Sequence, residues 1–158
     1  MSRALPFLAA AALVAAGIQG SRAGAPPSAA RICASLDEAA PPGTGAVLLV
    51  FFSTECPACY EELFEARYLV DRGGWPVTVI GVALSLRDDL EAFLDKYAWT
   101  APVVLDRRKA LFRRFGVDAV PFKALLLGPE TVYRDDPYLG PEARREELSR
   151  CLTRRFSR

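Results

Sequence analysis

One short stretch constrains this chain more than any other: an apolar run that leads directly into a pair of cysteines. Residues 46–52 are all apolar, which is typical of a strand buried on both faces of a sheet. The chain then turns, and Pro57 suits the first turn of a helix because the N–H that it lacks would have no partner there. Cys56 is therefore predicted at a helix N-terminus, where unpaired backbone N–H groups favour a thiolate.

The cysteine pair predicts thiol–disulfide exchange. Only two residues separate Cys56 from Cys59, so the two sulfurs can form a small, exchangeable disulfide ring. We predict Cys56 as the exposed attacking nucleophile and Cys59, one turn into the helix, as the buried resolving cysteine. The same motif can be half of a zinc site, but the chain has no histidine and its other cysteines, Cys33 and Cys151, are single. We therefore expect no metal.

Composition narrows the remaining possibilities. The 158 residues, 51% of them hydrophobic, are sufficient for one domain with a sizeable core. A net charge of +1 gives no argument for a nucleic-acid partner. Because there is no histidine, Ser-His and Cys-His catalysis and His-ligated copper or haem sites are excluded. We expect a monomer without a cofactor.

The N-terminus has the pattern of a secretory signal. A short positive start is followed by an apolar run over 4–18 and then by small residues. We predict a signal peptide over 1–23, a linker and N-terminal segment over 24–45, and one domain over 46–158. This pattern predicts an exported, periplasmic protein. An uncleaved membrane anchor is the alternative, although the run is shorter than the ~20 residues that span a bilayer.

Strands and helices alternate after the dithiol. The first helix is predicted to end at Gly73 and Gly74, and 77–84 reads as a second buried strand. Ser85 and Asp88 have the spacing of a capping box, which predicts the start of another helix. The apolar face of that helix comprises Leu86, Leu90, Phe93, Leu94 and Tyr97. This order of elements is a βαβ pattern.

The pattern continues with a short strand over 103–105. Asp106 can cap a following helix that reaches Phe115, with Gly116 as its end. An antiparallel hairpin is predicted from 123–127 and 131–134, which flank a turn sequence.

A last helix is predicted to begin at Pro141, with an inward face made of Leu148, Cys151 and Leu152. Cys33 and Cys151 lie outside the redox motif of a chain predicted to be exported, so we predict that they form a structural disulfide. By the chain-entropy model such a long closed loop contributes ~4 kcal/mol. The alternative is two unrelated cysteines.

Three stretches together carry a family resemblance: 51–59 with the dithiol, 101–106, and 115–121 with a Val-Pro pair. With them, the chain resembles the exported TlpA-like or redoxin group of thiol–disulfide oxidoreductases, over 46–128. The resemblance implies an α/β thioredoxin-like fold in which helices flank a central mixed β-sheet. It implies client proteins with cysteines or disulfides, and an electron-donating thiol–disulfide protein, as partners.

The resemblance also assigns further site residues. It implies that Pro121 is cis, that it stands beside the dithiol, and that Val120 and Pro121 border the groove for a client segment. Glu62 lies three residues beyond Cys59, on the same helix face, where reductases of the group often carry an acid. It is therefore a candidate proton relay for Cys59, the alternative being a solvated surface carboxylate.

The chain also departs from the group. Glu55 stands where a tryptophan is common, and Val120 stands where threonine is frequent. Phe122 and Lys123 replace the usual small hydroxylated pair after the proline. These departures bear on partner choice and on redox direction.

Acidic residues around the dithiol predict a reductant. Glu55, Glu61 and Glu62 place negative charge close to the cysteines. Like charge disfavours a thiolate, so the disulfide is relatively favoured and the dithiol becomes a better electron donor.

Two alternatives stay open: a thiol peroxidase, with Ser53 three residues before Cys56, and a soft-metal chaperone that binds through the two cysteines.

Overall fold

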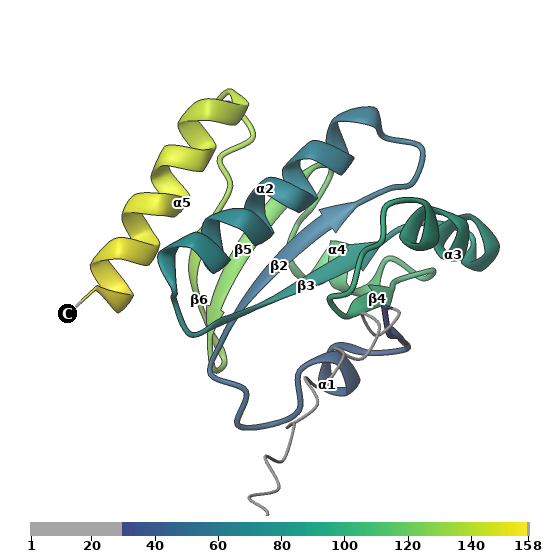
Figure 1. Ribbon diagram of the computed structural model, residues 1–158, viewed down its shortest axis with the longest axis horizontal. Helices are drawn as coiled ribbons and strands as arrows, with labels where there is room; N and C mark the ends of the chain where they lie inside the picture. Colours follow the sequence, from purple (N-terminus) through teal and green to yellow (C-terminus); the bar gives the residue numbers. More distant parts are fainter. Residues whose placement is uncertain (1–29, 158) are drawn as a thin grey trace, which may run out of the picture.

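The computed structural model describes residues 30–157, in which a six-stranded sheet carries helices on both faces (Figure 1). The strands lie in the order β1-β4-β3-β2-β5-β6. In chain order the elements are β1 (Ile32–Cys33), α1 (Leu36–Ala39), β2 (Ala46–Phe52), α2 (Pro57–Gly73), β3 (Val77–Ala83), α3 (Arg87–Lys96), β4 (Val103–Leu105), α4 (Ala110–Arg114), β5 (Phe122–Leu127), β6 (Glu130–Arg134) and α5 (Pro141–Phe156).

The sheet is mixed. β1, β4, β3 and β2 pair in parallel, whereas β5 pairs antiparallel with both β2 and β6. β2 has a neighbour on each side, and all of its residues are buried, which explains its continuous apolar sequence. The predicted α/β thioredoxin-like architecture with a central mixed sheet is confirmed.

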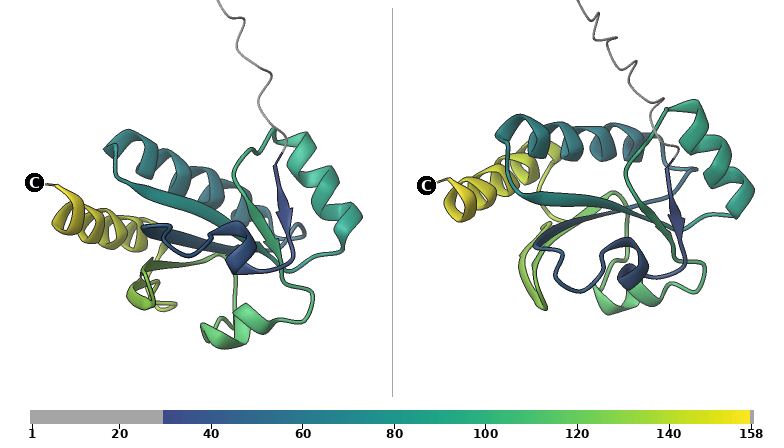
Figure 2. Two further views of the ribbon diagram at one scale, coloured as in Figure 1. Left: turned by 90° about the horizontal axis from the view of Figure 1, so that it is seen from below. Right: turned by 60° about the horizontal axis from the view of Figure 1, so that its bottom comes forward.

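The side chains of β2 pack alternately into two separate hydrophobic cores, one on each face of the sheet. Leu48, Val50 and Phe52 face the side covered by α2, α3 and α5, whereas Leu49 and Phe51 face the side covered by α1 and α4. Figure 2 shows these two layers of helices on opposite sides of the sheet. The period of two along a strand is the cause of this division.

Most helices begin and end at the residues that the sequence predicted. Pro57 occupies the first turn of α2 with Cys56 as the N-cap residue, and Gly74 closes that helix with a φ of 62°. The carboxylate of Asp106 accepts the N–H groups of Ala110, Leu111 and Phe112 at 2.8–3.0 Å, so it satisfies the start of α4.

The predicted capping box at α3 is wrong. Leu86 is the N-cap residue, no side chain caps the helix, and Leu86 is 64% exposed instead of packing in the core. The Ser85 hydroxyl is hydrogen-bonded to the Thr54 hydroxyl. That contact takes Ser85 away from the helix amides.

The predicted disulfide between Cys33 and Cys151 is also wrong. Both cysteines are free and buried, but Cys33 belongs to the core beneath α1 and α4, and Cys151 to the core beneath α2, α3 and α5. The sheet lies between them. The sequence predicted an inward position for Cys151, but it did not indicate that Cys33 and Cys151 belong to different cores.

The N-terminal segment contributes more than a linker. Within 24–45, β1 pairs in parallel with β4 at the edge of the sheet and α1 covers one face, so ordered structure begins well before 46. The signal peptide predicted over 1–23 lies outside the described residues. Among the helices of residues 30–157, none is long and apolar enough to cross a bilayer.

Candidate active site

The dithiol follows the C-terminal end of β2, a central strand of the sheet. After Phe52 the chain turns, with the Cys56 N–H donating to the Ser53 carbonyl and the Glu55 N–H donating to the Ser53 hydroxyl, both at 3.2 Å. The hydrogen bond between Thr54 and Ser85 ties this turn to the end of β3. The first residues of α2 are thereby held against two adjacent strands.

Cys56 and Cys59 form a disulfide, with their Cα atoms 5.3 Å apart. Cys56 is partly exposed, whereas Cys59 is fully buried. Because Cys56 is the N-cap residue of α2, its sulfur lies at the positive end of the helix. The geometry therefore has one sulfur open to a partner and one protected from it.

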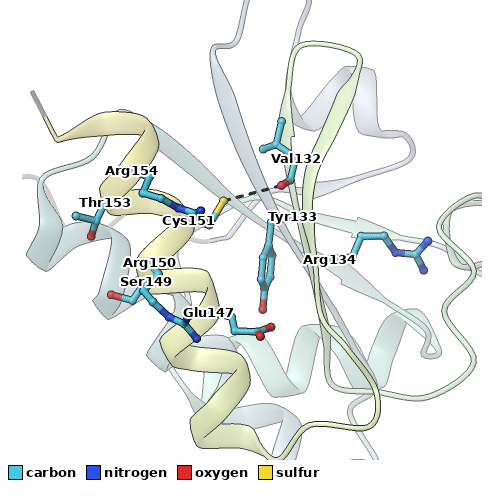
Figure 3. A pocket seen from close by; sticks show the side chains of 9 residues that line it. All are labelled: Val132, Tyr133, Arg134, Glu147, Ser149, Arg150, Cys151, Thr153 and Arg154. Carbon is cyan, nitrogen blue, oxygen red and sulfur yellow. Dashed lines mark hydrogen bonds between the residues drawn. The ribbon is translucent and has the colours of Figure 1, made fainter.

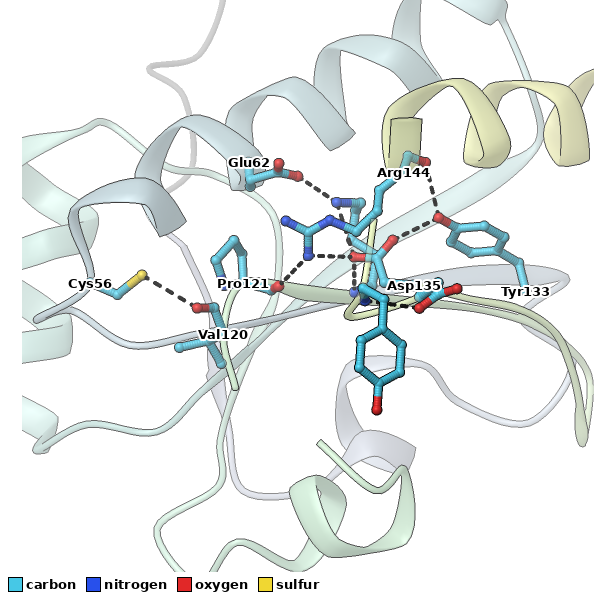
Figure 4. Close-up of polar contacts among 10 residues, drawn as sticks. Cys56, Glu62, Val120, Pro121, Tyr133, Asp135 and Arg144 are labelled. Carbon is cyan, nitrogen blue, oxygen red and sulfur yellow. Dashed lines mark hydrogen bonds and ion pairs between the residues drawn. The ribbon is translucent and has the colours of Figure 1, made fainter. Parts of the chain in front are cut away.

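The peptide bond between Val120 and Pro121 is cis, as the resemblance implied. The Cys56 Sγ lies 3.9 Å from the Val120 carbonyl oxygen. Figure 4 shows this carbonyl pointing toward the sulfur. The cis-proline loop and the N-terminus of α2 therefore meet at the exposed sulfur.

A cavity of about 540 Å³ opens beside Cys56, between the start of α2 and α3. Its aromatic wall includes Tyr60 and Tyr97, whose ring centroids are 4.2 Å apart, and Phe93, 4.8 Å from Tyr97. Its charged lining consists of Glu55, Asp89 and Lys96. The surface beside Cys56 therefore combines aromatic rings with charged side chains of both signs.

Another cavity, of about 590 Å³, lies between β6 and α5 (Figure 3). Cys151 lines it, with Sγ 3.9 Å from the Val132 carbonyl oxygen. The lining includes neither cysteine of the disulfide. It is therefore separate from the redox site.

Glu62 is not a solvated surface carboxylate. It is 7% exposed and forms an ion pair with Lys123, which is 1% exposed and lies in β5 two residues after the cis-proline. Sequence analysis noted Lys123 only as a departure from the group. The pair joins the helix that carries the dithiol to the strand that follows Pro121 (Figure 4).

Asp135 lies on the other side of Lys123. Its carboxylate is 3.2 Å from Lys123 Nζ and accepts the Lys123 N–H at 2.9 Å and the Tyr133 hydroxyl at 2.6 Å. Burial, followed by the hydrogen bond and negative charge of Asp135, holds the pKa of Tyr133 far above its ordinary value. Tyr133 therefore stays a neutral donor.

Arg144 of α5 closes the network. Its Nη1 is 3.7 Å from Asp135 Oδ2 and donates to the Pro121 carbonyl oxygen at 3.1 Å. The buried polar groups therefore connect α2, β5, α5 and the cis-proline loop. No sequence motif marked Asp135, Tyr133 or Arg144, because the contacts depend on how distant segments pack.

The residues around Cys56 add no support for the thiol-peroxidase alternative. The Ser53 hydroxyl accepts a local backbone N–H, and no arginine lines the cavity at Cys56. Within residues 30–157 there is no group of three or more histidine, cysteine or acidic side chains that could hold a metal ion.

The fold and the cysteine pair define the class: a thioredoxin-like thiol–disulfide oxidoreductase. The chain belongs to the AhpC/TSA family, whose model matches residues 34–133. No curated protein matches the chain.

Solved structures share the fold. StoA from Bacillus subtilis is 22% identical, with a TM-score of 0.56 over 70% of this chain and 84% of that one. DsbF of Mycobacterium tuberculosis, in its mixed oxidised and reduced forms, is 22% identical, with a TM-score of 0.57 over 70% and 81%. A secreted M. tuberculosis disulfide oxidoreductase homologous to E. coli DsbE is 18% identical, with a TM-score of 0.55 over 70% and 82%. At these identities the likeness establishes the fold.

Proposed function

We propose that this protein is an exported thiol–disulfide oxidoreductase that reduces disulfides of client proteins. One observation carries the proposal: a partly exposed Cys56 sulfur beside the Val120 carbonyl, bonded to a fully buried Cys59. This asymmetry supports Cys56 as the group that attacks first and Cys59 as the resolving cysteine. Val120 and Pro121 then border the client segment.

The exchange transfers two electrons to the client. The Cys56 thiolate attacks one sulfur of a client disulfide, which forms a mixed disulfide and releases the other client sulfur as a thiolate. Cys59 loses its proton and attacks the Cys56 sulfur. The Cys56–Cys59 disulfide forms, the second client sulfur leaves, and the client is reduced while the dithiol is oxidised.

Glu62 is the proposed acceptor of the Cys59 proton. It lies three residues further along α2, on the same helix face. Its carboxylate is buried and paired with the Lys123 ammonium instead of being exposed to solvent. When the protein is reduced again, the same carboxylate returns a proton to Cys59.

The reductant direction rests on Glu55 and Glu61. Both are exposed near the start of α2, where their negative charge opposes a thiolate at Cys56. Glu62 contributes less to this effect than its sequence position implied, because the Lys123 ammonium balances its charge. Exposure also screens Glu55 and Glu61, so the effect on the potential is modest.

Export and partners complete the proposal. The charged and apolar N-terminal pattern supports secretion into the periplasm, or anchoring to the membrane if the segment is not cleaved. In that compartment the dithiol needs a thiol–disulfide protein as electron donor. Clients are proteins with cysteines or disulfides, including cytochrome-type proteins.

Equilibration with glutathione buffers measures the redox potential of the dithiol and so tests whether the protein acts as a reductant. We expect a potential nearer ~−270 mV than ~−120 mV, the values for thioredoxin and a strong periplasmic oxidant. A potential close to ~−120 mV would refute the reductant role and leave the exchange chemistry intact. Metal analysis of the purified, reduced protein distinguishes the soft-metal alternative.

A further inference from the structure

The geometry points to Lys123 as a positioning residue for the dithiol: we propose that it holds the Glu62 carboxylate beside Cys59 and so controls how fast Cys59 resolves a mixed disulfide. The inference rests on the proposed function, because it assigns a further residue to the same exchange. It starts from an anomaly, a lysine in the otherwise apolar strand β5.

Burial makes the contacts of Lys123 obligatory. Its side chain is 2% exposed, and an ammonium removed from water is costly unless anions replace the lost hydration. Glu62 and Asp135 supply two carboxylates to the same Nζ atom. The position of this ammonium is therefore fixed by the fold.

The fixed ammonium restricts Glu62 in turn. A glutamate on a helix can point toward solvent or along the helix, whereas here the carboxylate points from α2 toward β5 (Figure 4). Cys59 and Glu62 share one face of α2, so this orientation keeps the carboxylate on the buried side where Cys59 lies.

Asp135 keeps Lys123 in place. It binds the backbone N–H of Lys123 as well as its ammonium, and the Asp135 N–H donates to the Lys123 carbonyl oxygen at 2.9 Å. Tyr133 and Arg144 bind the same carboxylate from β6 and α5. Lysine and arginine thus balance the two carboxylates, so the network is neutral as a whole when Glu62 is ionised.

Loss of the ammonium has two effects with the same sign. The Glu62 carboxylate becomes a buried charge without a counter-ion, which opposes formation of a thiolate at Cys59. It also loses the contact that orients it. Both effects slow the resolving attack without touching Cys56.

A chromogenic disulfide separates the two attacks. Reduced protein reacts with 5,5′-dithiobis(2-nitrobenzoate), and the attack by Cys56 releases one thionitrobenzoate. The attack by Cys59 on the resulting mixed disulfide releases the second and leaves the Cys56–Cys59 disulfide, so the reagent is reduced and the dithiol oxidised. The rate of the second release is measured from about pH 6 to about pH 9, a range around the ordinary thiol pKa.

Glu62→Gln, Lys123→Met and the double variant are compared. We expect each single variant to slow the second release at least about tenfold and to flatten its pH profile, with the first release unchanged. The double variant should be no slower than Glu62→Gln, because Lys123 acts through Glu62. Arg145→Met is the matched control: it breaks the surface pair with Glu65, also between α5 and α2, and should leave both releases unchanged.

A wild-type second release in Lys123→Met, or a double variant slowed by the product of the two single factors, would overturn the inference. If Lys123→Met does not fold, the double variant decides, since it leaves no unpaired Glu62 charge. A double variant slower than Glu62→Gln then refutes the positioning role. A wild-type protein that releases no thionitrobenzoate would instead refute the proposed function itself.

Discussion

Replacing Tyr133 with phenylalanine removes one hydroxyl from the network around Asp135. That hydroxyl donates to Asp135 Oδ1 at 2.6 Å and lies 3.0 Å from the Arg144 carbonyl oxygen. A hydrogen bond to a charged group contributes about 1.5–3 kcal/mol. Because the ring is partly exposed and water can replace part of the contact, we expect the free energy of unfolding at neutral pH to fall by about 1–2 kcal/mol.

The effect should depend on pH with a defined sign. Burial and Asp135 raise the pKa of Tyr133, so the folded protein keeps a proton that the unfolded chain loses near pH ~10. The contribution is complete below about pH 10 and falls above it by at most about 1.4 kcal/mol per pH unit, less where solvent screens the ring. Phenylalanine has no such proton, so the stability advantage of wild-type protein should shrink as pH rises.

Urea unfolding followed by circular dichroism at about pH 7, 9 and 11 measures this difference, and the pH values bracket the ordinary tyrosine pKa. Tyr138→Phe is the control, because Tyr138 is 94% exposed and should give no change at any pH. A constant difference between wild type and Tyr133→Phe from neutral to alkaline pH would refute the reasoning.

Two further predictions concern the core and a helix terminus. Denatured, unreduced protein should contain two free thiols, Cys33 and Cys151, when titrated with a thiol reagent; finding none would show that they are bonded after all. Asp106→Ala should lower the free energy of unfolding by about 2–3 kcal/mol in urea titrations, because three amides at the start of α4 lose their acceptor. A loss below about 0.5 kcal/mol would mean that water satisfies those amides equally well.

Local sequence rules predicted the centre of the fold. The apolar run of β2, Pro57 at the start of α2 and Gly74 at its end each act within a few residues, so their consequences could be read directly. The dithiol at the junction of strand and helix followed from the same rules. The cis-proline came only from the family resemblance, because no local rule fixes that isomer.

Predictions that depended on the packing of distant segments were wrong, and some contacts between distant segments were not predicted at all. Cys33 and Cys151 both point inward, but which of two cores each enters depends on strand order and on the face that each helix covers. The pairing of Glu62 with Lys123 spans 61 residues and depends on the register between β5 and β2. Ser85 is hydrogen-bonded to the hydroxyl of Thr54, in another loop, instead of capping the helix start that its spacing favoured.

The contact from Arg144 to the Pro121 carbonyl oxygen also bears on the order in which the protein is made. Arg144 belongs to α5, the last helix that the structure describes, whereas Cys56 and Pro121 are synthesised earlier. A chain that emerges with its N-terminus first, from a ribosome or across a membrane, can pair β2 with β3 before α5 is available. The loop beside the dithiol can gain its arginine only once α5 has emerged, so pairing of β2 with β3 can precede completion of the redox site.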